Sequence, residues 1–451
     1  MFRRSILDQF TKWKAGSHRK PLLLRGARQT GKTSAVRLFA SDLPGYMELN
    51  LEAPGEKSVF ERKLPVRDLI SAIRLSKGNT APLRESLLFI DEIQACASAL
   101  QYLRLIYEEV PELPVIASGS LFEVYLSGSG IEFPVGRVEH CFMHPVTFRE
   151  YLQAFQRYDM LEEMDKLPLK DYAFPSIYSE FVRYTLLGGM PEIVQALLEG
   201  NEPDFLGGIY SSLFISFLDD VPKYAPNRTM AEILRHCLET VPAETGKRIT
   251  FAGFGGSGYR SREVSQAMKT LQRALLLHLV YPTGQLEPPP TTNKRKSPKL
   301  YFVDSGLLAS TLNIQWSEMG TGDLNASFRG VLAEQVIAQS LLSLHNHTIP
   351  KLQFWARNKR GSSAEVDFVV QHTGKLIPIE VKSGSTGRLR SLHRFMEECN
   401  HDVAVRFYGG PVRIDLQNTP NGKKFRLLSL PHFLAENIND YIDWLFQNQS
   451  G

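Results

Sequence analysis

The chain has 451 residues, of which 43% are hydrophobic and 22% are charged, and its formal net charge is +4. This ordinary globular composition predicts two to four domains, and the mild basicity permits nucleic-acid binding without arguing for it. Four scattered cysteines without a C-x-x-C pair predict neither a zinc site nor a disulfide framework. The N-terminus lacks the apolar core of a signal peptide, and no run of 18 apolar residues occurs, so we expect a cytoplasmic protein without a membrane span.

The first informative segment in chain order is residues 22–33, LLLRGARQTGKT. A short apolar strand leads into the spacing G-x-x-x-x-G-K-[ST], which is typical of a loop that wraps phosphate groups. We expect Lys32 to reach the β- and γ-phosphates and the Thr33 hydroxyl to ligate Mg²⁺. The expected nucleotide-binding residues of this loop are Gly26, Ala27, Arg28, Gln29, Thr30, Gly31, Lys32, Thr33 and Ser34. An ordinary glycine-containing turn is the alternative.

A second apolar strand, residues 87–90, ends in Asp91 and Glu92. A wholly apolar strand suits a parallel sheet covered on both faces, and the carboxyl edge of such a sheet carries ligand chemistry. We expect Asp91 to complete the Mg²⁺ shell and Glu92 to act as the catalytic base on the attacking water. A third strand is followed by Ser118, whose hydroxyl would contact the γ-phosphate or that water; a plain Ser-Gly turn is the alternative.

These motifs resemble one group of prokaryotic AAA+ ATPases that carry a C-terminal domain of unknown function. The resemblance rests on GARQTGKT, FIDEIQ, ASGSL, the Gly-Arg of VGRVEH, HPVTFREYL and the GGMPE of residues 188–192, and it covers roughly residues 1–400. It implies that Arg137 is an arginine finger or sensor, in its own chain or a neighbouring one, and that the nucleotide is ATP rather than GTP. Spacing alone would make Arg137 a surface residue.

The middle of the chain reads as a charged linker or lid followed by helices. Residues 176–222 have helical apolar spacing that ends at Asp219 and Asp220, which we expect to be a solvated helix end. Helices at 231–241 and 262–277, a strand and a basic Pro-rich connection then look like a winged helix. Its expected phosphate contacts are Arg260, Arg262, Lys269 and Arg273, with Lys294, Arg295, Lys296 and Lys299 as a second basic group. A module that only packs against protein is the alternative.

The C-terminal part carries a second set of chemical residues. Glu334 is expected on the apolar face of a helix, where a carboxylate needs a partner. Two alternating strands flank Thr373-Gly374, and a two-residue turn there would place Asp367 opposite Glu380 on one face of a hairpin. The same register would place Glu365 opposite Lys382.

The carboxylates of Glu334, Asp367 and Glu380 would form a hard-oxygen site for Mg²⁺, with Lys382 as the catalytic lysine that orients water or stabilises the phosphate. The pattern resembles the restriction-endonuclease-like D…E-x-K nucleases, which implies the same roles for these four residues. A salt-bridge ladder on a surface hairpin is the alternative, and the fold can also bind DNA without cutting it.

The predicted fold class is α/β, with four parts: a P-loop AAA+ parallel-sheet ATPase domain (1–158), a helical lid or linker (159–228), a winged-helix domain (229–298), and a restriction-endonuclease-like domain with a terminal helix (299–451). We expect an ATP- and Mg²⁺-dependent ATPase that binds branched or structured DNA. The alternatives are an ATP-dependent switch whose nuclease-like domain is a docking module, and an ATP-regulated DNA nuclease. A monomer and a homo-oligomer, such as a hexameric ring, both remain open.

Overall fold

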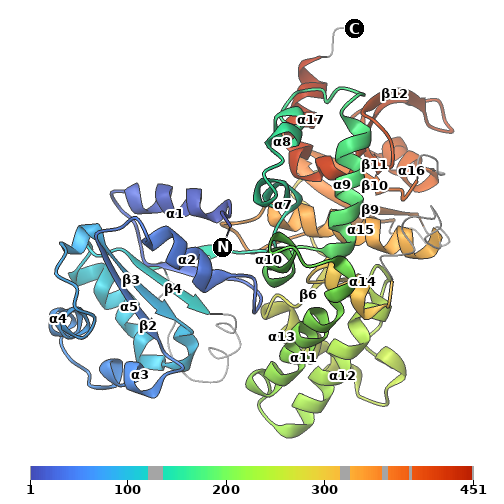
Figure 1. Cartoon of the computed structure of the whole chain (residues 1–451). Helices are drawn as coiled ribbons and strands as arrows, with labels where there is room; N and C mark the ends of the chain where they lie inside the picture. Colours follow the sequence, from blue (N-terminus) through green and yellow to red (C-terminus); the bar gives the residue numbers. More distant parts are fainter. Residues whose placement is uncertain (1, 120–135, 315–325, 358–363, 385–388, 449–451) are drawn as a thin grey trace.

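The structure is a computed structural model that describes residues 2–119, 136–314, 326–357, 364–384 and 389–448. Figure 1 shows an N-terminal α/β part, in blue and cyan, beside a larger body formed by the green to red segments. None of the helices in these ranges is long and apolar enough to cross a membrane.

The N-terminal part is built on a five-stranded parallel sheet in the order β2-β3-β4-β1-β5. Its strands are β1 (Leu22–Arg25), β2 (Gly45–Asn50), β3 (Ser86–Asp91), β4 (Val115–Gly119) and β5 (Glu139–Phe142), and its helices are α1 (Ile6–Ala15), α2 (Lys32–Ala40), α3 (Pro54–Glu61), α4 (Val66–Ser76) and α5 (Ala97–Glu109). Leu88 and Ile90 of β3 enter one apolar cluster, whereas Leu87 and Phe89 enter another, so both faces of the sheet are buried. The α/β parallel sheet predicted from the apolar runs is therefore confirmed.

A helical region follows this sheet. It consists of α7 (Phe148–Ala154), α8 (Tyr158–Met164), α9 (Phe174–Leu187), α10 (Pro191–Leu198), α11 (Gly207–Tyr224), α12 (Arg228–Glu244) and α13 (Ser261–Arg273). Helix α13 ends before the predicted residue 277, because Leu275 adopts a φ of 59° and the chain then turns into strand β6. A φ in this range cannot continue a right-handed helix.

The C-terminal part contains an eight-stranded mixed sheet in the order β12-β13-β11-β10-β9-β8-β6-β7. Its strands are β6 (Leu277–Thr283), β7 (Lys299–Phe302), β8 (Gln353–Ala356), β9 (Glu365–His372), β10 (Lys375–Val381), β11 (Val403–Tyr408), β12 (Arg413–Asn418) and β13 (Lys424–Pro431), and its helices are α14 (Ser305–Thr311), α15 (Ala326–Ser343), α16 (Arg390–Glu398) and α17 (Ile438–Gln447). Strands β6 and β7 pair antiparallel, and β6 also pairs with β8. The predicted domain boundary at residue 298 thus lies between two strands of one sheet.

The hairpin of β9 and β10 has the predicted turn. His372 pairs with Lys375 and Phe368 with Ile379, while Thr373 and Gly374 have φ values of 43° and 73°. Positive φ at both central residues is what a type I′ turn requires. This register, extended by one pair, places Asp367 opposite Glu380 at the open end of the hairpin.

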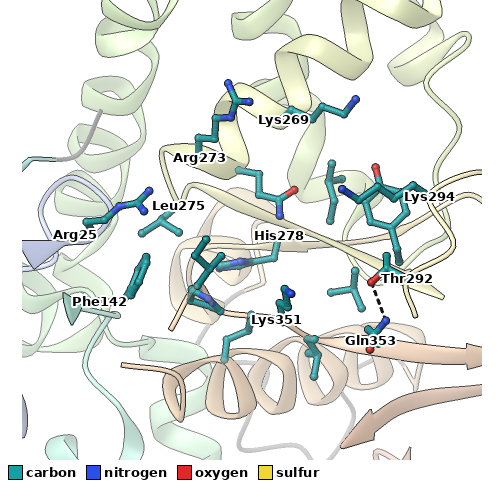
Figure 2. A pocket seen from close by; sticks show the side chains of 18 residues that line it. Arg25, Phe142, Lys269, Arg273, Leu275, His278, Thr292, Lys294, Lys351 and Gln353 are labelled. Atoms are coloured by element: carbon teal, nitrogen blue, oxygen red, sulfur yellow. Dashed lines mark hydrogen bonds between the residues drawn. The ribbon is translucent and has the colours of Figure 1, made fainter. Parts of the chain in front are cut away.

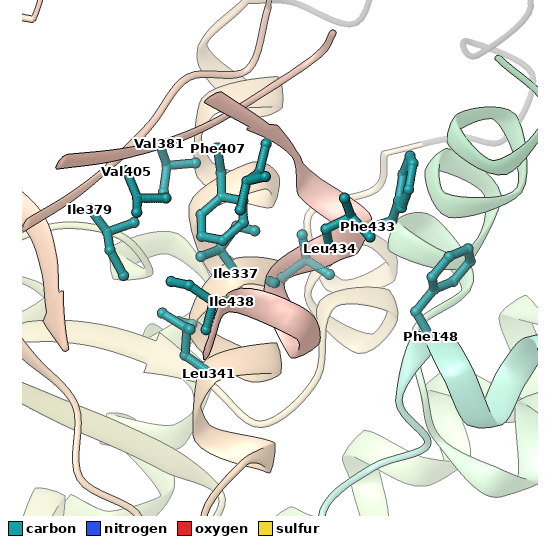
Figure 3. Close-up of a cluster of buried hydrophobic side chains, with 14 of the residues drawn as sticks. Phe148, Ile337, Leu341, Ile379, Val381, Val405, Phe407, Phe433, Leu434 and Ile438 are labelled. Atoms are coloured by element: carbon teal, nitrogen blue, oxygen red, sulfur yellow. The ribbon is translucent and has the colours of Figure 1, made fainter. Parts of the chain in front are cut away.

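A buried apolar cluster fixes helix α15 against this sheet. Figure 3 shows Ile379 and Val405 of the sheet near Ile337 and Leu341 of α15. Phe148 of α7 belongs to the same cluster. The cluster therefore fixes the position of α15, which carries Glu334, relative to the hairpin that carries Asp367 and Glu380. It also packs this region against the helices that follow the parallel sheet.

Candidate functional site

The P-loop, here residues 26–33, connects β1 to α2 at the carboxyl edge of the parallel sheet. Gly26 has no room for a side chain, since a Cβ there would lie 2.6 Å from the backbone oxygen of Met143. Gly31 has a φ of 89° and Gln29 a φ of 63°, so the loop curls back on itself before the helix begins. The two glycines of the motif are thus required by a close approach and by a left-handed conformation, as expected for a loop that wraps an anion.

Lys32 lies inside this loop. Its Nζ donates to the backbone oxygens of Gly26 at 3.1 Å and Ala27 at 2.9 Å. Burial lowers the pKa of Lys32, and the charges of Glu92 and Asp91 oppose that change. The ammonium group is therefore held over the loop by acceptors that a phosphate group can replace.

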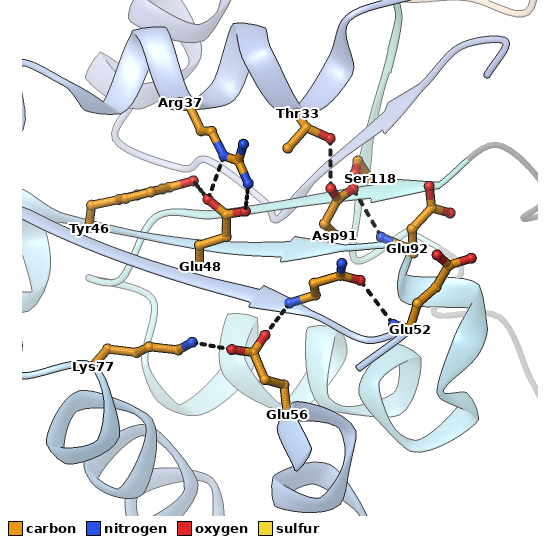
Figure 4. A network of polar contacts seen from close by, with 11 residues as sticks. Thr33, Arg37, Tyr46, Glu48, Glu52, Glu56, Lys77, Asp91, Glu92 and Ser118 are labelled. Atoms are coloured by element: carbon orange, nitrogen blue, oxygen red, sulfur yellow. Dashed lines mark hydrogen bonds and ion pairs between the residues drawn. The ribbon is translucent and has the colours of Figure 1, made fainter. Parts of the chain in front are cut away.

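Asp91 connects the three sequence motifs of the sheet edge (Figure 4). Its Oδ2 accepts from Thr33 Oγ1 at 2.6 Å, and its Oδ1 accepts from Ser118 Oγ. A threonine hydroxyl beside a carboxylate is a hard-oxygen donor pair that fits Mg²⁺. The structure thus brings together the residues predicted to hold Mg²⁺ in the ATP site.

Glu92 follows Asp91 in a left-handed conformation, with a φ of 52°, so that strand β3 ends at Asp91. Burial raises the pKa of Glu92, and the charge of Lys32 opposes that rise. Gln94 Nε2 donates to Glu92 Oε2. A raised pKa makes a carboxylate a better proton acceptor, as a catalytic base requires.

A cavity of about 410 Å³ opens over the P-loop, and several of its walls were not foreseen from the sequence. Arg28, Gln29, Gly31, Lys32, Thr33, Ser34 and Glu92 line it together with Phe2, Arg4, Pro191, Glu192 and Gln195. The GGMPE segment and the N-terminus were available as sequence signals, but nothing in their residue types places them beside a P-loop. Two distant segments therefore complete the site.

Arg4 stabilises the loop from outside. Its Nε donates to Glu150 Oε2 at 2.9 Å, and its Nη1 donates to the backbone oxygen of Thr30 at 3.1 Å. Arg4 and Glu150 are both buried, so the ion pair is shielded from solvent. Glu150 also completes the capping box of α7 with Thr147, which explains why an acid follows the apolar residues of HPVTFREYL.

The expectation of a solvated acidic pair at residues 219 and 220 is wrong for Asp220. Asp220 is 6% exposed and forms an ion pair with Arg28 of the P-loop. Ser216 of the same helix, α11, donates to Gln29 Oε1 at 3.0 Å. The sequence could not show this contact, because 192 positions separate Arg28 from Asp220.

Arg137 is not brought to the nucleotide site of its own chain. Strand β5 runs parallel to β1 with Glu139 opposite Leu22, so Arg137 precedes the amino end of β5, whereas the P-loop follows the carboxyl end of β1. Its Nε donates to Glu108 Oε1 at 2.9 Å at the end of α5. A role for Arg137 in a neighbouring chain stays a prediction.

The carboxylates predicted in the C-terminal part gather around a lysine. Lys299 Nζ lies 2.8 Å from Glu334 Oε1, 3.2 Å from Glu365 Oε1 and 3.1 Å from Asp367 Oδ1. The assignment of Lys299 to the second basic group, with Lys294, Arg295 and Lys296, is therefore wrong, since this side chain is only 5% exposed and is paired with acids. Burial opposes its charge, but the three acids raise the pKa of Lys299 above its usual value.

Glu380 and Lys382 form the second half of this carboxylate cluster. Lys382 Nζ donates to Glu380 Oε1 at 2.6 Å, and Asp367 Oδ2 accepts from the backbone nitrogen of Val381 at 2.9 Å. Burial first, and the charge of Asp367 second, raise the pKa of Glu380 to about 8. The structure thus brings Asp367, Glu380 and Lys382 close together, as the hairpin register predicted.

The arrangement does not fit a divalent cation while Lys299 stays in place. Within the described ranges, no three His, Cys, Asp or Glu side chains are placed so that they could hold a metal ion. The ammonium group of Lys299 contacts Glu334 and Asp367 at hydrogen-bond distance and supplies the positive charge that a metal would bring. The metal role of Glu334, Asp367 and Glu380 stays a prediction that requires Lys299 to move.

Comparison with known families agrees with the geometry of the P-loop. Residues 18–152 match the family described as an AAA domain. The chain contains an AAA domain. Two further matches follow it, residues 178–318 to the domain of unknown function DUF8612 and residues 329–433 to the domain of unknown function DUF4143. The expected C-terminal domain of unknown function is confirmed, whereas neither match describes a nuclease.

The curated relatives carry no described activity. Uncharacterized protein Rv2008c of Mycobacterium tuberculosis and uncharacterized protein Mb2031c of Mycobacterium bovis are each 25% identical over 431 residues, which cover 91% of this chain and 82% of the relative. Among solved structures, the Walker-type ATPase PABY2304 of Pyrococcus abyssi is 16% identical, covers 69% of this chain and 96% of its own, and has a TM-score of 0.42. The ORC1 protein of Aeropyrum pernix, solved in complex with DNA, is 12% identical with a TM-score of 0.27 and covers 70% of this chain and 92% of its own.

Proposed function

We propose that this protein hydrolyses ATP at the P-loop and uses the nucleotide cycle to act on DNA. The observation that carries the hydrolytic part is the contact of Asp91 with both Thr33 and Ser118, beside a glutamate whose pKa is raised. AAA-type chemistry needs a phosphate cradle, a metal-binding hydroxyl and carboxylate, and a base at one sheet edge. The cradle and Thr33 follow the end of β1, while Asp91 and Glu92 lie at the end of β3, where Ser118 of β4 contacts Asp91.

Lys32 and the loop bind the triphosphate. Lys32 exchanges the carbonyl oxygens of Gly26 and Ala27 for phosphate oxygens, and the first N–H groups of α2 point at the same anion. Thr33 and Asp91 would hold Mg²⁺, which would supply positive charge next to the phosphates. The exchange keeps Lys32 paired throughout, so the buried ammonium group is never left without an acceptor.

Glu92 takes the proton of the attacking water. Its pKa is raised by burial, and the hydrogen bond from Gln94 fixes the direction of its carboxylate. A base held in position by a neutral donor keeps its orientation without being neutralised, unlike a base in an ion pair. Glu92 is therefore suited to general-base catalysis, whereas Asp91, whose carboxylate already accepts three hydrogen bonds, is not.

The test is a comparison of nucleotide binding and hydrolysis. The Lys32→Ala variant is expected to lose both, and Glu92→Gln only the second, because glutamine keeps the shape of the side chain but cannot accept the proton. Lys12→Ala, at an exposed position on α1, is the matched control. Wild-type turnover in a Lys32→Ala protein would overturn the assignment.

The DNA-related part of the proposal is tested by ATP turnover with single-stranded, duplex and four-way-junction DNA. Stimulation by one of these supports it. A flat response favours the switch alternative, for which the contacts of Arg28 with Asp220 and of Gln29 with Ser216 are the specific support. These contacts let a change at the phosphates reach α11 directly, and a switch without DNA would show almost no salt dependence in DNA-binding assays.

A metal-dependent nuclease is the less favoured alternative, because Lys299 holds two of the three expected ligands. Its specific support is the unpaired buried Oε2 atom of Glu380 beside Lys382. If the protein cuts DNA there, Glu380→Ala abolishes cleavage and leaves ATP turnover unchanged. Duplex and junction DNA that stays intact over long incubation with Mg²⁺ or Mn²⁺ excludes this alternative.

A further inference from the structure

A second cavity, of about 330 Å³, lies between the AAA domain, helix α13 and the C-terminal sheet. Figure 2 shows Lys269 and Arg273 of α13 on one side of it, Lys294 of the β6–β7 connection on another, and Lys351 on the segment that leads into β8. Arg25, the last residue of β1, closes the cavity on the side of the AAA domain. Its volume is within the range of small-molecule sites in proteins.

The charge of this cavity has one sign. Among the described residues that line it, five are Lys or Arg and none is Asp or Glu. Lys269, Arg273, Lys294 and Lys351 are all exposed, and no ion pair joins them to any acid in the described part of the chain. Like charges that face a common space repel one another, so this cavity is more favourable with an anion inside it.

The lining of the cavity also contains apolar and aromatic side chains. Phe142, Leu279 and Tyr281 are among them, and the side chain of Gln353 donates to Thr292 Oγ1 at 2.8 Å. Burial lowers the pKa of His278 to about 3, so His278 adds a neutral ring rather than a charge. Exposed cations beside apolar and aromatic side chains are a combination that suits a phosphate linked to a flat base.

We infer that this cavity binds a phosphate ester, either a phosphodiester of a nucleic-acid strand or the phosphate of a free nucleotide. The inference rests on the proposed action on DNA and names the site for it. It also corrects the two basic groups predicted from the sequence: Lys269, Arg273 and Lys294 converge, Lys351 joins them from another segment, and Lys299 faces away into the carboxylate cluster.

The cavity adjoins the ATP site through one strand end. Arg25 lines the cavity, and the next residue, Gly26, begins the P-loop. The backbone nitrogen of Met143 donates to the oxygen of Arg25 at 2.6 Å, and the oxygen of Met143 faces Gly26. A ligand that contacts Arg25 therefore acts on a strand end that the P-loop shares, which links binding in this cavity to ATP turnover.

The experiment uses full-length protein and two double variants, Lys269→Ala with Arg273→Ala, and Lys294→Ala with Lys351→Ala. The control is Arg62→Ala with Lys424→Ala, which removes the same charge at exposed positions elsewhere. All are checked for folding by thermal unfolding. Binding of a labelled 20-nucleotide oligothymidylate is measured by anisotropy at several salt concentrations, and binding of thymidine monophosphate by calorimetry in a Lys32→Ala background, so that the P-loop does not contribute.

If a strand occupies the cavity, each double variant removes two phosphate contacts, each worth about 0.7 in the steepness of a plot of log association constant against log salt concentration. The plot therefore becomes less steep by about 1.4, and binding at 0.1 M salt weakens roughly 20-fold, while the control changes neither. If a free nucleotide occupies it, the double variants lose thymidine monophosphate binding and leave the strand slope unchanged. Equal binding of both ligands by the cavity variants and the control variant overturns the inference. It is also overturned if the protein with an intact cavity binds neither the strand nor thymidine monophosphate.

These outcomes are separate from failure of the proposed function. A protein that binds no strand but loses thymidine monophosphate in the double variants keeps the cavity and loses the action on DNA. A protein whose variants all bind strands and thymidine monophosphate equally well keeps DNA binding and loses the cavity. Neither arm depends on hydrolysis, so an inactive P-loop changes neither result.

Discussion

Replacing Lys299 with methionine tests whether the C-terminal carboxylates are neutralised from within the chain. Methionine fills a similar volume but leaves Glu334, Glu365 and Asp367 without the ammonium group that now lies within 3.2 Å of each. Removing one partner of a buried ion pair costs about 3–5 kcal/mol. Because these acids retain 18–25% exposure, we expect the lower end, about 3 kcal/mol, which corresponds to a fall of roughly 6–12 °C in the melting temperature of a domain of this size.

The assay is thermal unfolding between pH 5 and pH 8, with Lys424→Met at an exposed strand position as the control. The deficit of Lys299→Met should shrink towards pH 5, because burial already raises the pKa of Glu334 and loss of the lysine raises it further, so protonation removes the repulsion. Millimolar Mn²⁺ should raise the melting temperature of Lys299→Met and not of the parent protein. A Lys299→Met variant that melts within 1 °C of the parent protein at pH 8 would refute the reasoning. It would also be refuted if the parent protein binds Mn²⁺ in the absence of nucleotide and the Asp367→Asn substitution abolishes that binding.

Three further predictions follow from the two sites. Glu92→Gln should bind ATP like the parent but hydrolyse it at least roughly 10²-fold more slowly, measured by single-turnover kinetics; a smaller loss would mean that another group is the base. Asp220→Ala should bind a fluorescent ATP analogue several-fold more tightly, since it removes a carboxylate near the phosphates and releases Arg28, and unchanged or weaker binding would contradict this. Glu380 has a pKa of about 8 in the folded protein against an ordinary value of 4.5, so the stability from its protonated form is complete below pH 4.5 and is lost as the pH rises through 8. Glu380→Gln should flatten the plot of melting temperature against pH between these two values. Plots for the variant and the parent protein that run parallel there would count against this prediction.

Much of the AAA domain, and the hairpin turn of the C-terminal part, were predictable because their signals are local. The glycine spacing of residues 26–31, the apolar strand before Asp91 and the turn at Thr373-Gly374 each depend on neighbours in the chain, and on backbone conformations that few residue types adopt. The roles expected of Lys32, Thr33 and Ser118 follow from the same local patterns. Their convergence at one sheet edge needs only that parallel strands end at the same side.

Only the tertiary structure decided where charges meet. Lys299 is read from the sequence as one more basic residue after a Pro-rich connection, yet it is buried among acids that lie 35 to 68 positions further along. Arg137 follows a motif glycine, yet parallel pairing of β5 with β1 carries it to the edge opposite the P-loop. Sequence periodicity predicts which face of a helix or strand is buried. The partner of a buried charge is set instead by packing between remote segments, because the free energy of an ion pair depends on the distance between its charges and on the exclusion of water.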